Sequence, residues 1–157
     1  MKRVLQMVTL AAVVSGLLVG SSSALLPDFS KEELITNAEG IVLGQVRDLR
    51  CAWNEDHSQI FTYVTVAVEE QLKGSSSSSE ILVQIPGGTV GEITLTVTDT
   101  PTLERGMRVI LHTFFQDTGY LWIYGWEKGA LVVENNAIPV YQMTVDQFRQ
   151  LVQSVQE

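Results

Sequence analysis

Apolar and polar residues alternate at every second position over much of the chain, which predicts a protein built mainly of β-strands. In residues 60–70, valines at alternate positions share one face, and the run continues into Leu72, Lys73 and Gly74. Gly44 interrupts an earlier run and predicts a bulge or sharp bend. Further runs predict strands at 41–46, 81–85, 92–98, 107–115, 120–124 and 130–133, with a candidate edge strand at 139–141.

The most regular alternation lies at 92–98. We expect Ile93, Leu95 and Val97 to face inward and the threonines between them to face solvent. The serine-rich segment 74–79 is predicted to be a flexible hairpin connection rather than a linker between domains. Turn signals recur at roughly regular spacing along the chain. Together the runs predict a small closed barrel of about six or seven antiparallel strands rather than a parallel sheet.

Two helices are predicted to flank the strands. Ser30 and Glu33 have the spacing of a capping box, in which each side chain accepts a hydrogen bond from the other residue's backbone, and they predict a short helix over 31–38. A similar threonine–glutamine pair begins the segment 144–156, where apolar residues recur at helical spacing. The fold class is therefore mainly β, with a short N-terminal helix and a C-terminal amphipathic helix.

The first 24 residues do not follow the strand pattern. Two basic residues precede a mostly apolar run over 4–19, and Ser22 and Ala24 stand at the spacing that signal peptidase accepts. The apolar run is short for a membrane span of about 20 residues, so an uncleaved anchor is the less favoured alternative. We therefore predict a signal peptide at 1–24 and a single domain at 25–157. The protein would be secreted or periplasmic, in the cell envelope, and would meet a membrane only through this segment before cleavage.

Charge and cysteine content narrow the possible partners and covalent links. The formal charge is −8, and it becomes −10 without the signal segment, because eight basic and eighteen acidic residues remain. A negative field repels nucleic acid, so no nucleic-acid partner is expected. Cys51 is the only cysteine, which excludes an intramolecular disulfide. A half-buried strand position is favoured for Cys51 over a nucleophile or a dimer-forming thiol.

The sequence carries no recognisable catalytic set. His57 lies in a polar turn that lacks the alternating oxygen ligands of a calcium loop, so a solvated turn is favoured over a metal site. His112 is expected on the surface or half-buried. A dyad of Cys51 and His57 is the least favoured alternative. The glycine-rich segment 86–91 lacks the lysine of a phosphate loop and predicts a turn. We expect no enzyme activity, no catalytic residue, no cofactor and no metal.

Aromatic residues carry the candidate binding site. Tyr120, Trp122 and Tyr124 fall at every second position of one predicted strand, and Trp53 lies beside an earlier turn. Exposed aromatic faces of small barrels bind sugars, peptides or single-stranded nucleic acid, and the acidic charge opposes the last of these. Core packing explains at least half of the rings. The expected partner is an unknown protein or a glycan. The whole aromatic set is Trp53, Phe61, Tyr63, Tyr120, Trp122, Tyr124 and Trp126.

The order of elements also resembles the netrin-module and tissue-inhibitor-of-metalloproteinase family, which has an OB-like barrel. The resemblance lies in the run 37–46, in Leu72, Lys73 and Gly74 at the end of a long strand, in the turn 88–91, and in the strand after Arg105. It covers most of 25–157 and extends to a recurring kind of exported bacterial protein with the same Leu-Lys-Gly and Pro-Gly-Gly pattern.

The resemblance implies an OB-like fold. The export signal, the strand pattern and the lack of a recognisable catalytic set predict a secreted, non-enzymatic binding or interaction domain of unknown ligand. Regulation or inhibition of an extracellular protease is the alternative, and carbohydrate binding through the aromatic face is a second one. The inhibitors of that family grip the protease zinc through an N-terminal cysteine held by disulfides. Here the predicted mature chain begins at Leu25 and has no disulfide, so that inhibitory mechanism does not carry over.

Overall fold

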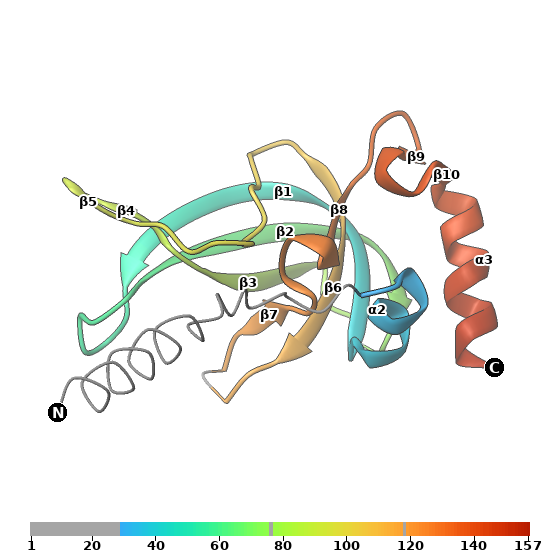
Figure 1. Ribbon diagram of the computed structural model, residues 1–157, viewed down its shortest axis with the longest axis horizontal. Helices are drawn as coiled ribbons and strands as arrows, with labels where there is room; N and C mark the ends of the chain where they lie inside the picture. The colour runs from blue at the N-terminus through green and yellow to red at the C-terminus, as the bar shows by residue number, and fades with distance from the viewer. Residues whose placement is uncertain (1–28, 76, 118) are drawn as a thin grey trace, which may run out of the picture.

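The computed structural model describes residues 29–157 except 76 and 118, so the predicted signal peptide at 1–24 lies outside the described residues. The chain is mainly β, as predicted, with helices α2 and α3 close together at one end (Figure 1). The elements are α2 (Lys31–Asn37), β1 (Gly40–Trp53), β2 (Ile60–Lys73), β3 (Glu80–Pro86), β4 (Gly88–Val90), β5 (Ile93–Leu95), β6 (Arg108–Phe115), β7 (Leu121–Ile123), the 3-10 helix η1 (Trp126–Gly129), β8 (Ala130–Val132), β9 (Ala137–Ile138), the 3-10 helix η2 (Pro139–Tyr141), β10 (Met143–Thr144) and α3 (Val145–Gln156). No helix within the described ranges is long and apolar enough to cross a membrane.

The long hairpin of β1 and β2 bends where the sequence predicted it. The register shifts between Leu43 and Gly44. A Cβ atom at Gly44 would lie 2.4 Å from the carbonyl oxygen of Ala67, closer than a real side chain can approach. Glycine is therefore required because the two strands approach closely at the bend.

Strand pairing departs from the prediction at one point. Among the described residues the main sheet has the order β1-β2-β3-β7-β6-β8, and β6 also pairs with β1. The sequence predicted antiparallel strands throughout, but β3 and β7 are parallel and share the single residue pair Val83 and Leu121. The prediction failed because a parallel contact between strands far apart in sequence leaves no local turn signal.

Two apolar cores stabilise the fold. One joins side chains of five strands to a loop residue, and the other fills the space between strands and helices. The first core consists of Val42, Val46, Val64, Val66, Ile81, Val83, Ile85, Leu103, Val109, Leu111 and Ile123. The second consists of Ile35, Ala38, Ile41, Leu43, Ile110, Leu131, Val133, Ile138, Val145, Phe148 and Val152.

Helix α3 is fixed at its start and along its side. The predicted capping box is present: the Thr144 hydroxyl accepts from the backbone of Gln147, whose side chain accepts from the backbone of Thr144. Arg149 donates two hydrogen bonds of 2.7 Å to the carboxylate of Glu70 on β2. These bonds favour the ionised carboxylate and hold the pKa of Glu70 below its usual range. The equivalent box at Ser30 begins α2.

The Leu-Lys-Gly ending of β2 has a structural explanation. The Lys73 ammonium donates hydrogen bonds to the carbonyl oxygens of Ile35 at 2.7 Å and Thr36 at 2.9 Å. Both carbonyls belong to the last turn of α2, where the helix dipole favours a cation. The preceding Leu72 packs against the core beneath the helices. The motif therefore attaches α2 to the end of β2.

Replacement of Lys73 with methionine should lower the free energy of unfolding by about 1–2 kcal/mol, because two helix-end carbonyls lose a charged donor while the apolar stem is kept. Chemical denaturation measures the change. Lys31→Met is the matched control, since the Lys31 ammonium only lies over the Tyr141 ring at 6.0 Å. Equal losses in the two variants would contradict the capping role.

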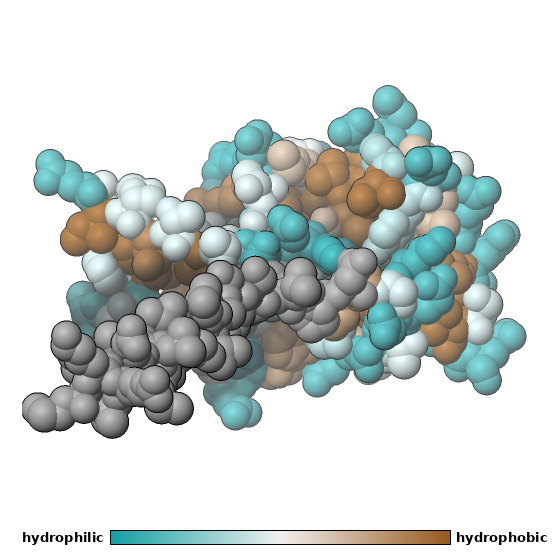
Figure 2. Space-filling model, in the orientation of Figure 1, coloured by the Kyte–Doolittle hydropathy of each residue, from teal (hydrophilic) through white to brown (hydrophobic). Residues whose placement is uncertain are grey.

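Two strand predictions were wrong. In the segment 92–98 only Ile93–Leu95 forms a strand, and it pairs with β4 alone. Ile93 is 55% exposed and Leu95 is 36% exposed, although both were expected to face inward. The alternation was correct, but among the described residues β5 pairs with β4 alone, and the hairpin projects from the body and carries a hydrophobic patch (Figures 1 and 2). The candidate edge strand at 139–141 is the 3-10 helix η2.

Candidate functional site

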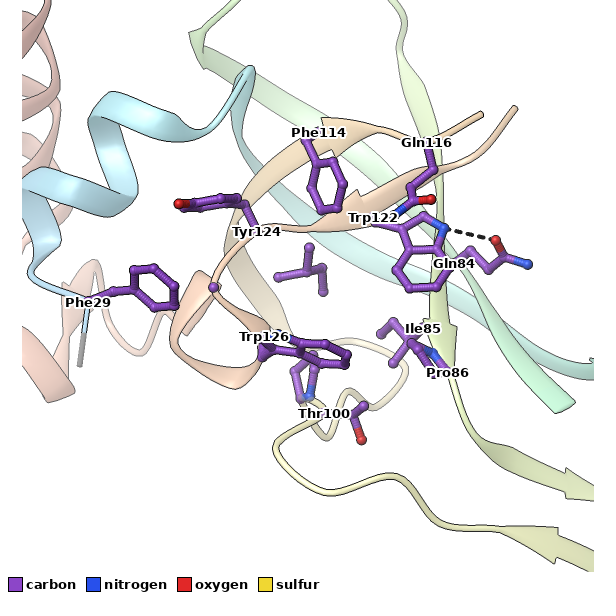
Figure 3. A pocket seen from close by; sticks show the side chains of 13 residues that line it. Phe29, Gln84, Ile85, Pro86, Thr100, Phe114, Gln116, Trp122, Tyr124 and Trp126 are labelled. Carbon is purple, nitrogen blue, oxygen red and sulfur yellow. Dashed lines mark hydrogen bonds between the residues drawn. The ribbon is translucent and has the colours of Figure 1, made fainter. Parts of the chain in front are cut away.

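An aromatic pocket of about 230 Å³ opens beside β3, β7 and η1 (Figure 3). Five rings belong to its lining, and none of its lining residues is charged. The lining residues are Phe29, Gln84, Ile85, Pro86, Thr100, Pro101, Phe114, Gln116, Trp122, Ile123, Tyr124, Gly125 and Trp126.

The pocket forms where two strands separate. The β3–β7 ladder consists of one residue pair, Val83 and Leu121. Beyond that pair, Ile85 and Pro86 continue along one side, and Ile123 continues along the other. Within the described residues the β3–β7 ladder does not extend to these positions, and their side chains line the pocket. The pocket therefore lies beside the point where the β3–β7 ladder ends.

Trp126 reaches the pocket through a constrained turn. Gly125 has φ +79° and Trp126 has φ +56°, both in the left-handed region. A Cβ at Gly125 would lie 2.3 Å from Leu34 Cδ2, so only glycine fits beneath α2. A bulky residue in this conformation costs about 1–3 kcal/mol and persists where the surroundings impose it. Trp126 nevertheless stays 40% exposed, so the turn presents a large ring to solvent rather than burying it.

The loop at 99–101 is held against the turn that carries Trp126. The Glu127 backbone N–H donates a 2.8 Å hydrogen bond to the carbonyl oxygen of Asp99. Asp99 precedes Thr100 and Pro101, which both line the pocket. The bond holds this loop against η1, so two segments distant in sequence form one wall.

The polar side chains on the β3 side are held in a short chain of hydrogen bonds. The Trp122 indole Nε1–H donates to Gln84 Oε1 at 2.9 Å, and Gln84 Nε2 donates to the Tyr63 hydroxyl at 3.2 Å. The Arg50 guanidinium lies over the Tyr63 ring at 5.5 Å. Phe61 meets the Trp122 ring edge-on at 5.8 Å. The Trp122 ring is therefore fixed in place before any ligand arrives.

The four sequence-predicted site residues occupy different places. Trp122 and Tyr124 both line the aromatic pocket. Tyr120 is not part of the pocket lining, and its ring lies edge-on to that of Tyr63 at a centroid distance of 5.2 Å. Trp53 is at the end of β1, where it stacks on His57 at 6.3 Å. The structure thus brings two of the four candidates together and leaves their role in binding a prediction.

Sequence reasoning missed three ring-bearing members of the lining. Trp126 was counted among the aromatic residues but not chosen, because a turn between glycines gives no strand face. Phe29 and Phe114 gave no signal, since one precedes α2 and the other looks like a core strand residue. Phe114 lies 6.2 Å from Tyr124 with the rings perpendicular, and Phe29 lies 5.6 Å from Tyr124. These contacts arise only from the tertiary fold.

A second, wider cavity of about 590 Å³ lies between the β4–β5 hairpin and the loop 99–103. Threonines and aliphatic residues line it, together with Cys51. The Cys51 thiol lies 3.4 Å from the Thr62 hydroxyl and is half-buried, as predicted. His57 lies in an exposed turn and stacks on Trp53, so the cysteine and this histidine have separate neighbours.

The prediction that His112 lies on the surface or half-buried was wrong. His112 is 0% exposed on β6, because α3 covers that face and places Phe148 edge-on at 5.9 Å. His112 Nδ1 donates to the Gly129 carbonyl oxygen at 3.0 Å, while Nε2 has no partner among the described residues. Burial, assisted by the nearby Lys73 charge, lowers the pKa of His112 to about 4. His112 is therefore a neutral core residue, and it is not among the residues that line the aromatic pocket.

No group of three or more metal-ligating side chains occurs in the part of the chain that the structure describes. The lining offers a ligand mainly aromatic area, and its polar side chains outside the aromatic rings are Gln84, Thr100 and Gln116. No protein-family model matches the sequence, and no curated protein shows significant similarity to it.

Proposed function

We propose that this chain is an exported, non-enzymatic binding domain and that the aromatic pocket is its ligand site. The observation that carries the proposal is Trp126, a large apolar side chain kept 40% exposed by a left-handed turn beside four other rings. Strain of this kind gathers at ligand-binding sites. A concave, mostly apolar surface with a few fixed polar groups is what small-ligand sites require.

The fold proposal is a closed OB-like barrel of the netrin-module kind. Pairings run from β1 through β2, β3, β7 and β6 back to β1, which supports closure. Side chains from these five strands pack together in one core, as they do inside a small barrel. The outer surface of strands 2 and 3 is where OB-like barrels bind ligands. Gln84 of β3 lies in the lining, so the proposed site adjoins that surface.

The test is a thermal-shift screen of the purified exported protein against organic cations, monosaccharides and proline-rich peptides. A ligand of the pocket should raise the melting temperature of the wild type and have little effect on Trp126→Asn. Asparagine tolerates the left-handed backbone, so this variant removes the ring with little added strain. Phe115→Ala is the matched control, because Phe115 is 61% exposed and does not line the pocket.

Two results would overturn the binding proposal. One is a screen in which every stabilising compound acts equally on the wild type and on Trp126→Asn. The other is turnover of common hydrolase substrates that disappears in Cys51→Ala or His57→Ala, which would make the chain an enzyme.

Carbohydrate binding is the second candidate function. Tyr63 and Tyr120 meet edge-on at 5.2 Å and remain half-buried, and Trp126 presents a 40% exposed ring at the aromatic pocket. Sugars stack on such rings through their apolar faces. Retained sugar binding after Trp122→Ala or Trp126→Asn would count against it. Regulation of an extracellular protease rests on the family resemblance alone.

A further inference from the structure

The rings of the aromatic pocket enclose space from several directions rather than forming one flat platform. Phe114 is perpendicular to Tyr124, and Phe29 is tilted by 55° from the same ring. Trp122 and Trp126 lie on other sides in Figure 3. A flat platform suits the face of a sugar ring, whereas rings set at steep angles surround a compact, rounded group.

The polar atoms of the pocket are poorly suited to a ligand rich in hydroxyl groups. Trp122 Nε1–H is already bonded to Gln84, and the Gln84 amide is already bonded to Tyr63. A sugar would need several donors and acceptors to replace the water that it loses. Thr100 and Gln116 are the non-aromatic polar side chains left in the lining. The chemistry therefore favours a ligand that needs few hydrogen bonds.

Charge favours a cation over an anion. No lysine or arginine lines the pocket, and the whole chain has a formal charge of −8. The exposed residues Asp99 and Glu127 directly precede and follow the lining residues Thr100 and Trp126, and Lys128 comes next. The long-range field of such a protein raises the local concentration of cations. Aromatic faces, tryptophan most of all, attract cations through the ring quadrupole.

We infer that the aromatic pocket binds a small organic cation with a trimethylammonium head, held by Trp122, Tyr124 and Trp126. The inference rests on the proposed function and specifies its ligand class. A methylated ammonium has a positive charge and no strong hydrogen-bond donor, so the apolar lining satisfies it without new polar groups. The volume of about 230 Å³ suits a compact head group rather than an extended chain.

The experiment is a calorimetric titration of the purified exported protein with choline and with 3,3-dimethylbutan-1-ol, its uncharged isostere. Choline should bind at least about tenfold more tightly than the isostere, because only the cation gains the quadrupole attraction. Trp126→Asn should weaken choline by at least about tenfold, Trp126→Phe by less, and Phe115→Ala should leave it unchanged. Glucose and a proline-rich peptide complete the panel.

The possible results separate this inference from the proposed function. If the isostere binds as tightly as choline, or if glucose or the peptide binds in a Trp126-dependent way while choline does not, the cation inference is overturned and the binding site stands. If choline binds equally well to Trp126→Asn and to the wild type, the assignment of the site is overturned as well. Absence of choline binding to the wild type also overturns the inference.

Discussion

Replacing Phe148 with alanine should lower the free energy of unfolding by about 3–5 kcal/mol, the usual cost of emptying a buried phenylalanine site. The Phe148 ring is 0% exposed and belongs to the core between the strands and α3. It meets His112 edge-on at 5.9 Å and stacks on Tyr141 at 6.3 Å. Chemical denaturation of the variant measures the loss.

Phe115→Ala is again the control for this substitution. Phe115 is 61% exposed, so its removal should change the free energy of unfolding by less than about 0.5 kcal/mol. Comparable losses at the two positions would mean that α3 is not packed on the strands as described.

Acidification from pH 6.5 to pH 4 should destabilise the protein by about 3 kcal/mol through His112 alone. In the unfolded chain this imidazole binds a proton near pH 6.5, whereas in the folded state its pKa is about 4. Between these values the unfolded state holds more protons, so falling pH favours unfolding. The stability that neutral His112 contributes is fully present above pH 6.5, and it is lost as the pH falls through the folded-state pKa of about 4.

The substitution His112→Gln isolates this effect from the titration of carboxylates, which also lose charge in acid. The glutamine does not titrate. The wild type should therefore lose about 3 kcal/mol more than the variant between pH 6.5 and pH 4, measured by denaturation at each pH. Parallel pH profiles for the two proteins would contradict the burial of a neutral imidazole.

Local patterns in the sequence predicted the local structure well. The structure confirms several features that depend on neighbouring residues. These are the capping boxes at Ser30 and Thr144, the bend at Gly44 and the long hairpin before Gly74. The same logic failed where burial depends on distant segments. His112 is buried where Phe148 of α3 packs against its ring, and Ile93 is exposed because its strand pairs with β4 alone among the described residues.

The candidate site could be predicted only in part for the same reason. Trp122 and Tyr124 fall at alternate positions of a predicted strand, so they were chosen as candidates, and both line the pocket. Trp126 depends on a left-handed turn beneath α2, and Phe29 depends on the position of the segment before that helix. Trp53 was chosen because it lies beside a turn, yet that turn is not among the segments that line the pocket. Periodicity identifies faces of strands, and it carries no information on which faces meet.

If the ligand binds in the aromatic pocket, the three tryptophans report it directly. Trp122 and Trp126 line the pocket, whereas Trp53 stacks on His57 outside the lining. An NMR titration of the indole N–H signals with choline should shift those of Trp122 and Trp126 and leave that of Trp53 in place. A shift confined to Trp53, or saturable binding that moves none of the three signals, would contradict the account.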